Sequence, residues 1–146
     1  MLALAAHPNI QAVKDCGGDA EKTRHLIADG RLQVLTGEDA TVFTTLCQGG
    51  SGAIAAAAHL CPELYCAMAA ALAEGQLEPA RALHHALAPL VQALFREPNP
   101  ASIKALLAAR GLIRNELRAP LMPVSAALWA ELDILWTGIA AFAQCR

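Results

Sequence analysis

The chain has 146 residues and a formal net charge of −2, and 55% of its residues are apolar although only 4% are aromatic. This length suits one ordinary domain and falls short of the roughly 250 residues of a complete (β/α)8 barrel. The balanced charge, without a cluster of Lys and Arg, argues against nucleic acid as a partner. A core built mainly from Ala, Leu, Ile and Val favours tightly packed helices.

The cysteines and the two ends of the chain bear on the cellular compartment. No CxxC pair and no zinc-type spacing occurs, so we expect reduced thiols in a cytoplasmic protein and no metal site. The first eight residues carry no basic segment and contain His7 and Pro8, which argues against a signal peptide. Glu131 and Asp133 interrupt the apolar C-terminal segment, so we expect no membrane-spanning helix. The cysteines are Cys16, Cys47, Cys61, Cys66 and Cys145.

The first half of the sequence predicts three β-then-α units. Short extended runs are the expected strands, at residues 9–14, 32–36 and 51–56. A helical segment follows each run, and these helices are expected at residues 19–30, 39–47 and 62–73. Three such units in succession predict a parallel sheet.

Local signals indicate where these helices begin and end. Asp19 and Asp39 are the expected N-caps of the first two helices, because each carboxylate precedes a helical segment. Pro62 suits the first position of the third helix. Gly30 and Gly75 are the expected stops of the first and third helices.

After Gly75 the strand signal disappears, and three further helices are expected at residues 78–95, 100–110 and 125–143. In the last of them, five apolar residues at spacings of three and four predict one apolar face for core packing or subunit contact. They are Leu128, Leu132, Leu135, Ile139 and Phe142. The chain therefore divides into an α/β region at residues 1–75 and a helical region at residues 76–146.

Lys14 is the strongest candidate for chemistry, because it ends the first predicted strand, where parallel barrels place catalytic groups. An amine attacks a ketone only in its unprotonated form, so a catalytic lysine needs burial among apolar neighbours. The alternative is a structural lysine that extends from the strand end into solvent. Its position alone favours that alternative.

Two other groups of polar residues are weaker candidates. Glu38 and Asp39 could act as an acid/base pair, but the expected role of Asp39 as a helix N-cap explains it better. His84 and His85 are adjacent on a predicted helix and point about 100° apart, which argues against a shared metal site. We assign catalysis to none of these four residues.

Several segments in order resemble one enzyme superfamily. Residues 7–19, which contain Lys14-Asp15, resemble the Schiff-base strand of the dihydrodipicolinate synthase and N-acetylneuraminate lyase superfamily. Residues 34–40 are similar to its Leu-Ser-Gly-Asp-Asp segment, and residues 49–54 to its Gly-Gly-x-Gly-x-Ile strand. Further on, two segments resemble the synthase branch in particular. They are Leu94 to Pro100, followed by Lys104, and Leu117 to Pro123.

The resemblance implies the last three β/α units of a partial (β/α)8 TIM barrel, followed by a C-terminal helical region. It implies a class I aldolase, a lyase that needs no cofactor because Lys14 forms a covalent imine with pyruvate. The backbone carbonyl of Ile54 would contact the bound pyruvate, and Gly37 would keep the mouth of the site open. The synthase branch condenses pyruvate with aspartate semialdehyde in lysine biosynthesis. The strands expected are only the family's sixth to eighth, so we expect a truncated form that associates with a second copy or a complementary N-terminal half.

Two alternatives stay open. One is a sister pyruvate aldolase that uses the same lysine with another aldehyde, as N-acetylneuraminate lyase and keto-deoxy sugar acid aldolases do. The other is a non-catalytic remnant or assembly module in which the helical region mediates contacts. Ala at positions 55 to 58, where the family tends to hold hydroxyl and amide groups, supports the remnant. Tyr65, the one tyrosine, does not match a proton-relay position of the family.

Overall fold

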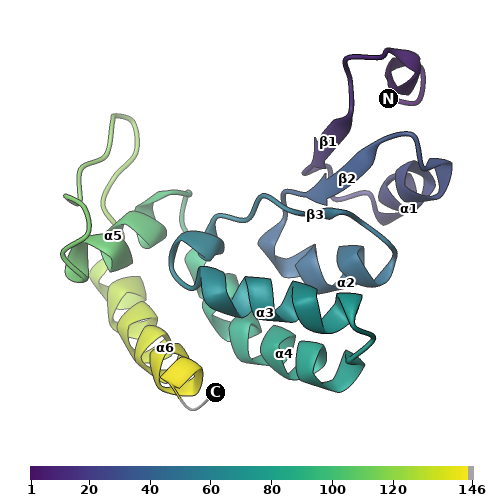
Figure 1. The fold of residues 1–146 in the computed structure, drawn as a ribbon. Coiled ribbons are helices and arrows are strands. Elements are labelled where there is room, and N and C mark those ends of the chain that lie inside the picture. Colours follow the sequence, from purple (N-terminus) through teal and green to yellow (C-terminus); the bar gives the residue numbers. More distant parts are fainter. Residues whose placement is uncertain (145–146) are drawn as a thin grey trace.

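The computed structural model describes residues 1–144 of the chain (Figure 1). Three short strands form one parallel sheet in the order β1-β2-β3, as the β-then-α pattern predicts. The register pairs Lys14 with Leu35 and Leu35 with Gly52, so these positions form one row across the sheet. The strands are β1 (Ala12–Asp15), β2 (Gln33–Thr36) and β3 (Gly52–Ala53).

The helices that follow the strands begin and end largely where local signals predict. The Asp19 carboxylate accepts a hydrogen bond of 3.0 Å from the Lys22 amide, which confirms the first N-cap, and Gly30 ends that helix at φ +74°. Pro62 occupies the first turn of the third helix, as expected. These helices are α1 (Ala20–Asp29), η2 (Asp39–Thr41) with α2 (Val42–Cys47), and α3 (Pro62–Ala73), with short 3-10 turns at η1 (Leu4–Ala6) and η3 (Ala57–His59).

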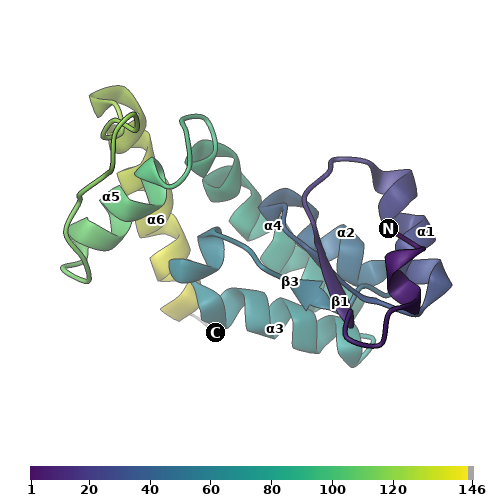
Figure 2. The ribbon, with the colours of Figure 1, turned by 90° about the horizontal axis from the view of Figure 1, so that it is seen from above.

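The second half is helical, as predicted, with α4 (Leu77–Leu94), α5 (Ala101–Ala109) and α6 (Ala126–Gln144). Figures 1 and 2 show α3 and α4 side by side between the sheet and the α5–α6 pair. The core lies among these helices. It contains residues from both of the regions that the sequence divides at residue 75, because α3 packs on α4. Burying each large core side chain stabilises the fold by about 1.5–3 kcal/mol. The most deeply buried large residues are Leu60, Met68, Leu83, Leu90, Leu94, Leu106 and Leu132.

Helix α6 uses its predicted apolar face for packing. Leu128, Leu132 and Ile139 are buried, and Leu135 and Phe142 pack partly buried against the same core. Contrary to expectation, residues 126–143, with a mean hydropathy of 1.3, are long and apolar enough to cross a membrane by length and composition. One such helix is weak support for a membrane span, because core helices of soluble proteins have the same composition.

The two faces of the sheet differ in exposure. Side chains alternate along a strand, so Asp15, Val34 and Thr36 lie on the face that packs against helices and are buried. Lys14 lies on the opposite face and is exposed. The Ile54 side chain, just after β3, is 51% exposed. The sheet therefore presents one open face.

The third strand is shorter than the predicted run at residues 51–56, and the first begins at Ala12 rather than at residue 9. The β3 pairing ends when the Ile54 amide donates to the Thr36 carbonyl at 2.8 Å. The next two amides that donate, those of Ala56 and Ala57, bind the Asp39 carboxylate instead of a strand. A side-chain partner thus ends this strand. Four of the cysteines are free thiols, and Cys145 lies outside the described residues.

Candidate active site

Lys14 stands at the C-terminal end of β1 on the open face of the sheet. The sequence led us to require burial for a catalytic lysine, but the Lys14 side chain is exposed. The reason is geometric, because within residues 1–144 the helices cover the opposite face. The described chain therefore presents the amine without enclosing it.

Gly37 lies directly against the Lys14 side chain. Its amide donates to the Asp15 carbonyl at 2.8 Å, which brings the turn after β2 to the end of β1. A β-carbon built at position 37 would lie 2.5 Å from Cε of Lys14 and 2.1 Å from Sγ of Cys16. Any larger residue would displace both side chains, so glycine leaves the room that Lys14 occupies.

Ile54 follows β3 at the same edge of the sheet. Its amide donates to the Thr36 carbonyl, the residue before Gly37, so the segment runs beside the Gly37 turn. Among residues 1–144 no hydrogen bond is donated to the Ile54 carbonyl. The structure thus brings Lys14, Gly37 and Ile54 to one edge of the sheet.

A buried carboxylate fixes the chain just after Lys14. Asp15 is 6% exposed and receives hydrogen bonds from the Lys22 ammonium at 2.6 Å, the Thr23 hydroxyl at 2.6 Å and the Gly17 amide at 3.2 Å. Burial raises the pKa of Asp15, but these three bonds and the Lys22 charge lower it, and the net pKa lies below 3.8. The network holds the turn at residues 15–19 to the start of α1.

Asp39 does not cap its own helix, so that prediction is wrong. Its carboxylate, on a side chain that is 6% exposed, accepts from the Ala57 amide at 2.6 Å and from the Ala56 amide at 3.0 Å. No side-chain cap is present at the start of η2 or α2. The bonds to Ala56 and Ala57 turn this side chain away from the start of its own helix. Asp39 joins the turn after β2 to the segment after β3.

The remaining polar candidates lie elsewhere. His84 stacks on Phe43 at 4.9 Å between ring centroids, and burial and the neighbouring His85 lower its pKa. No group of three or more potential metal ligands occurs within residues 1–144. Tyr65 is buried in the helical core, and its hydroxyl has no partner in the described part of the chain.

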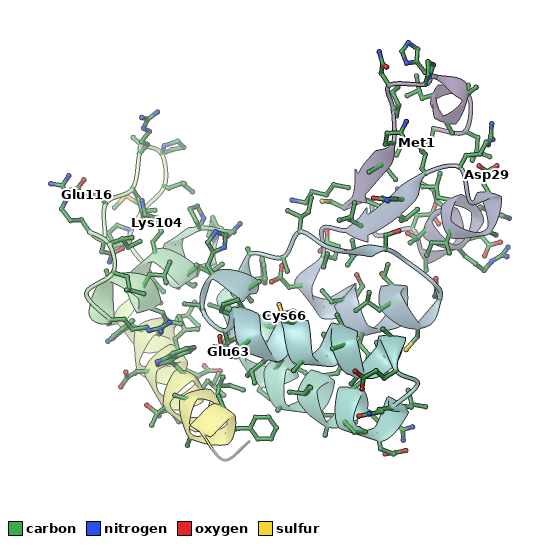
Figure 3. All side chains as sticks on the ribbon, in the orientation of Figure 1. Met1, Asp29, Glu63, Cys66, Lys104 and Glu116 are labelled. Atoms are coloured by element: carbon green, nitrogen blue, oxygen red, sulfur yellow. The ribbon has the colours of Figure 1, made fainter. Side chains whose placement is uncertain are left out.

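The segments that resemble the synthase branch lie around α5. Figure 3 shows Lys104 on α5 close to Glu116 in the following loop, and the Lys104 ammonium donates to the Glu116 backbone carbonyl. This bond ties residues 111–125 to α5. Figure 1 shows α5 and this loop on the other side of the α3–α4 pair from β1, so these residues shape the helical region and not the sheet edge.

Fold and site together define a parallel α/β protein with a lysine at the C-terminal edge of its sheet, the edge at which parallel barrels place their catalytic groups. Residues 1–135 match the sequence model of the Dihydrodipicolinate synthetase family. The chain belongs to this family.

Individual relatives agree with this placement. The chain is 40% identical over 124 residues to 4-hydroxy-tetrahydrodipicolinate synthase of Thermodesulfovibrio yellowstonii, covering 84% of this chain and 43% of that protein. The enzyme of Methanosarcina mazei is 37% identical over 135 residues, covering 90% and 46%. The crystal structure of dihydrodipicolinate synthase from Thermotoga maritima superposes with a TM-score of 0.88 at 32% identity, covering 92% of this chain and 48% of that one. The chain thus spans about half the length of the relatives it matches.

The sequence did not reveal the roles of Asp39 or Lys22. Each side chain binds a partner that is not its neighbour in sequence. Asp39 accepts from amides 17 and 18 residues away, and Lys22 pairs with Asp15, the residue after Lys14. A carboxylate two residues after Gly37 was the one available signal, and the sequence favoured a helix cap for it.

Proposed function

We propose that this chain contributes the imine-forming part of a 4-hydroxy-tetrahydrodipicolinate synthase, which condenses pyruvate with aspartate semialdehyde in lysine biosynthesis. The single observation that supports this most is the contact of Lys14 with Gly37 at the edge where Ile54 also lies. A strand-end lysine with space kept beside it would admit a ketone to its amine, which is one condition of Schiff-base chemistry. The similarity to curated 4-hydroxy-tetrahydrodipicolinate synthases favours this enzyme over the sister aldolases.

In the proposed reaction, the unprotonated Lys14 amine attacks the ketone carbon of pyruvate. Loss of one water molecule leaves the protonated imine, and loss of a methyl proton from it gives the neutral enamine, whose terminal carbon attacks the aldehyde carbon of the semialdehyde. Attack of the semialdehyde's own amino group on the imine carbon then closes the ring and releases Lys14 as the free amine. The Ile54 carbonyl would accept a hydrogen bond from the bound intermediate. Gly37 would leave room for the pyruvate beside Lys14. The lysine itself supplies the electron sink, so the reaction calls for no cofactor or metal.

Activity would require a partner that covers the open face of the sheet, where Lys14 lies. We propose that residues 1–75 are the last three β/α units of a (β/α)8 barrel and that residues 76–146 are its C-terminal helical region. A complementary N-terminal half would cover Lys14, lower the polarity around the amine and supply the proton-relay groups. A second copy of this chain is the other candidate for that cover. Exposed Ile54, Leu2 and Leu4 favour such a partner, because apolar surface gains from burial. We place the protein in the cytoplasm.

Reduction with borohydride in the presence of pyruvate tests the proposal. We expect peptide mass spectrometry to find the reduced adduct on Lys14 in the purified chain, with a higher yield after a complementary N-terminal half is added. Lys14→Arg should abolish the adduct, and Lys104→Arg, which alters a lysine in the helical region, should leave it unchanged. Folded protein without an adduct under both conditions would refute the enzyme and favour the assembly module.

A further inference from the structure

Asp39 connects two segments that both border the Lys14 site. One of its carboxylate oxygens accepts from the Ala57 amide at 2.6 Å, and the other accepts from the Ala56 amide at 3.0 Å. The residue is 6% exposed, so water competes little with these bonds. Asp39 lies two residues after Gly37, and Ala56 lies two residues after Ile54. The link therefore spans from the Gly37 turn to the segment that bears the Ile54 carbonyl.

The Ile54 segment is held at both of its ends. At its start, the Ile54 amide donates to the Thr36 carbonyl at 2.8 Å, which continues the pairing of β2 with β3. At its end, the Ala56 and Ala57 amides donate to Asp39. Only Ile54 and Ala55 lie between these anchors, so the direction of the Ile54 carbonyl depends on both. The regular strand ends at Ala53. Beyond Ile54, the Asp39 carboxylate and not β2 accepts the hydrogen bonds of the segment.

We propose that Asp39 is a positioning residue that aims the Ile54 carbonyl at pyruvate bound to Lys14. The inference rests on the proposed function of that site. The Ala56 and Ala57 amides donate to different oxygens of the Asp39 carboxylate, so the side chain at position 39 must offer two acceptors. Asn has nearly the same shape but only one acceptor, and its NH2 group would face an amide N–H. Asp39→Asn therefore breaks the link while it changes the volume of the side chain very little.

The test compares the full chain with three variants. Asp39→Asn replaces one of the two acceptor oxygens by an NH2 group, and Ala56→Pro removes one donor at a residue whose φ of −73° suits proline. Thr41→Val is the matched control, because it removes hydrogen bonds to Thr36 and Glu38 in the same turn without touching Ala56 or Ala57. Amide hydrogen exchange of residues 53–58 reports the link, and borohydride trapping at graded pyruvate concentrations reports the site.

For Asp39→Asn and Ala56→Pro we expect faster exchange at residues 54, 55 and 57, and residue 56 reports only in Asp39→Asn because proline has no amide hydrogen. We also expect an increase of about tenfold in half-saturating pyruvate, with the maximal adduct on Lys14 retained. Thr41→Val should match wild type in both measurements. Unchanged exchange in both link variants would overturn the link. Faster exchange with unchanged half-saturation would show a purely structural role and overturn the inference. A wild-type chain without any adduct would refute the proposed function instead, and exchange would still decide whether Asp39 holds the segment.

Discussion

The side chain of Lys14 and the backbone of Gly37 occupy adjoining space, so that a β-carbon at position 37 would lie 2.5 Å from Cε of Lys14. The atoms in the way are the ends of two side chains, Lys14 and Cys16, and not backbone. A substitution here therefore acts on the position of the amine more than on the fold.

For Gly37→Ala we expect adduct formation on Lys14 to fall at least tenfold, because the methyl group displaces the amine from the site. The melting temperature should change little, since flexible side-chain ends can move aside. Trapping with pyruvate and calorimetry measure the two effects. Gly138→Ala, where no atom lies within 4 Å of the new methyl group, is the control and should leave trapping unchanged. Wild-type trapping in Gly37→Ala would show that the space beside Lys14 is not needed.

Asp15→Asn should destabilise the chain by about 1–2 kcal/mol at pH 7, after allowance for a Lys22 side chain that is 33% exposed. The folded-state pKa of Asp15 lies below 3.8, so its contribution is complete above that pH and is lost as the pH falls through the lowered pKa. The difference between wild type and variant should thus narrow as the pH falls below 3.8 and vanish only below the lowered pKa of Asp15.

Urea unfolding at pH 7, 5 and 3 measures this difference. Glu21→Gln provides the comparison, because Glu21 is 64% exposed in its pair with Arg24 and should contribute nothing measurable. A difference between wild type and Asp15→Asn that persisted unchanged at pH 3 would mean that the charge of Asp15 does not stabilise the turn after Lys14.

Features that depend on nearby residues were predicted correctly, and a feature that depends on residues far along the chain was not. The starts at Asp19 and Pro62 and the stop at Gly30 were predictable, because each depends on atoms within one helical turn. Asp39 was misassigned because its partners lie 17 and 18 residues away, and no local rule distinguishes a helix cap from a long-range bond. The parallel direction of the strands followed from the β-then-α pattern.

The family resemblance named Lys14, Gly37 and Ile54, and their roles stay a prediction. The structure brings the three residues to one edge because they follow three successive strands, and the carboxyl ends of parallel strands meet at one edge. The exposure of Lys14 could not be read from its neighbours in sequence, because burial depends on what covers the open face of the sheet. The apolar runs around it are equally compatible with a covered and an uncovered strand.

Arg110, after α5, joins the segment before α3 to α6, and we expect Arg110→Ala to lower stability by about 1–2 kcal/mol. Its guanidinium donates to the Leu60 carbonyl at 3.0 Å and lies over the Trp136 ring at 4.6 Å from the centroid. Thermal unfolding should show a decrease of several degrees. Arg81→Ala is the control, since Arg81 pairs only with exposed Glu78 one turn away. Equal melting of both variants would mean that the contacts of Arg110 contribute no net stability.

Tyr65→Phe should leave stability unchanged or raise it by up to about 1 kcal/mol, because the buried hydroxyl has no partner among residues 1–144 and its removal relieves a desolvation cost. Burial raises the pKa of Tyr65, so the phenol stays protonated at all pH values where the chain would be assayed. Ser102→Ala removes the other such hydroxyl and should behave alike in calorimetry. Adduct formation on Lys14 should not change in Tyr65→Phe, since the ring lies in the helical core and not on the open face of the sheet. A marked loss of adduct in this variant would place a proton relay on α3, and the N-terminal partner would then not be required for that step.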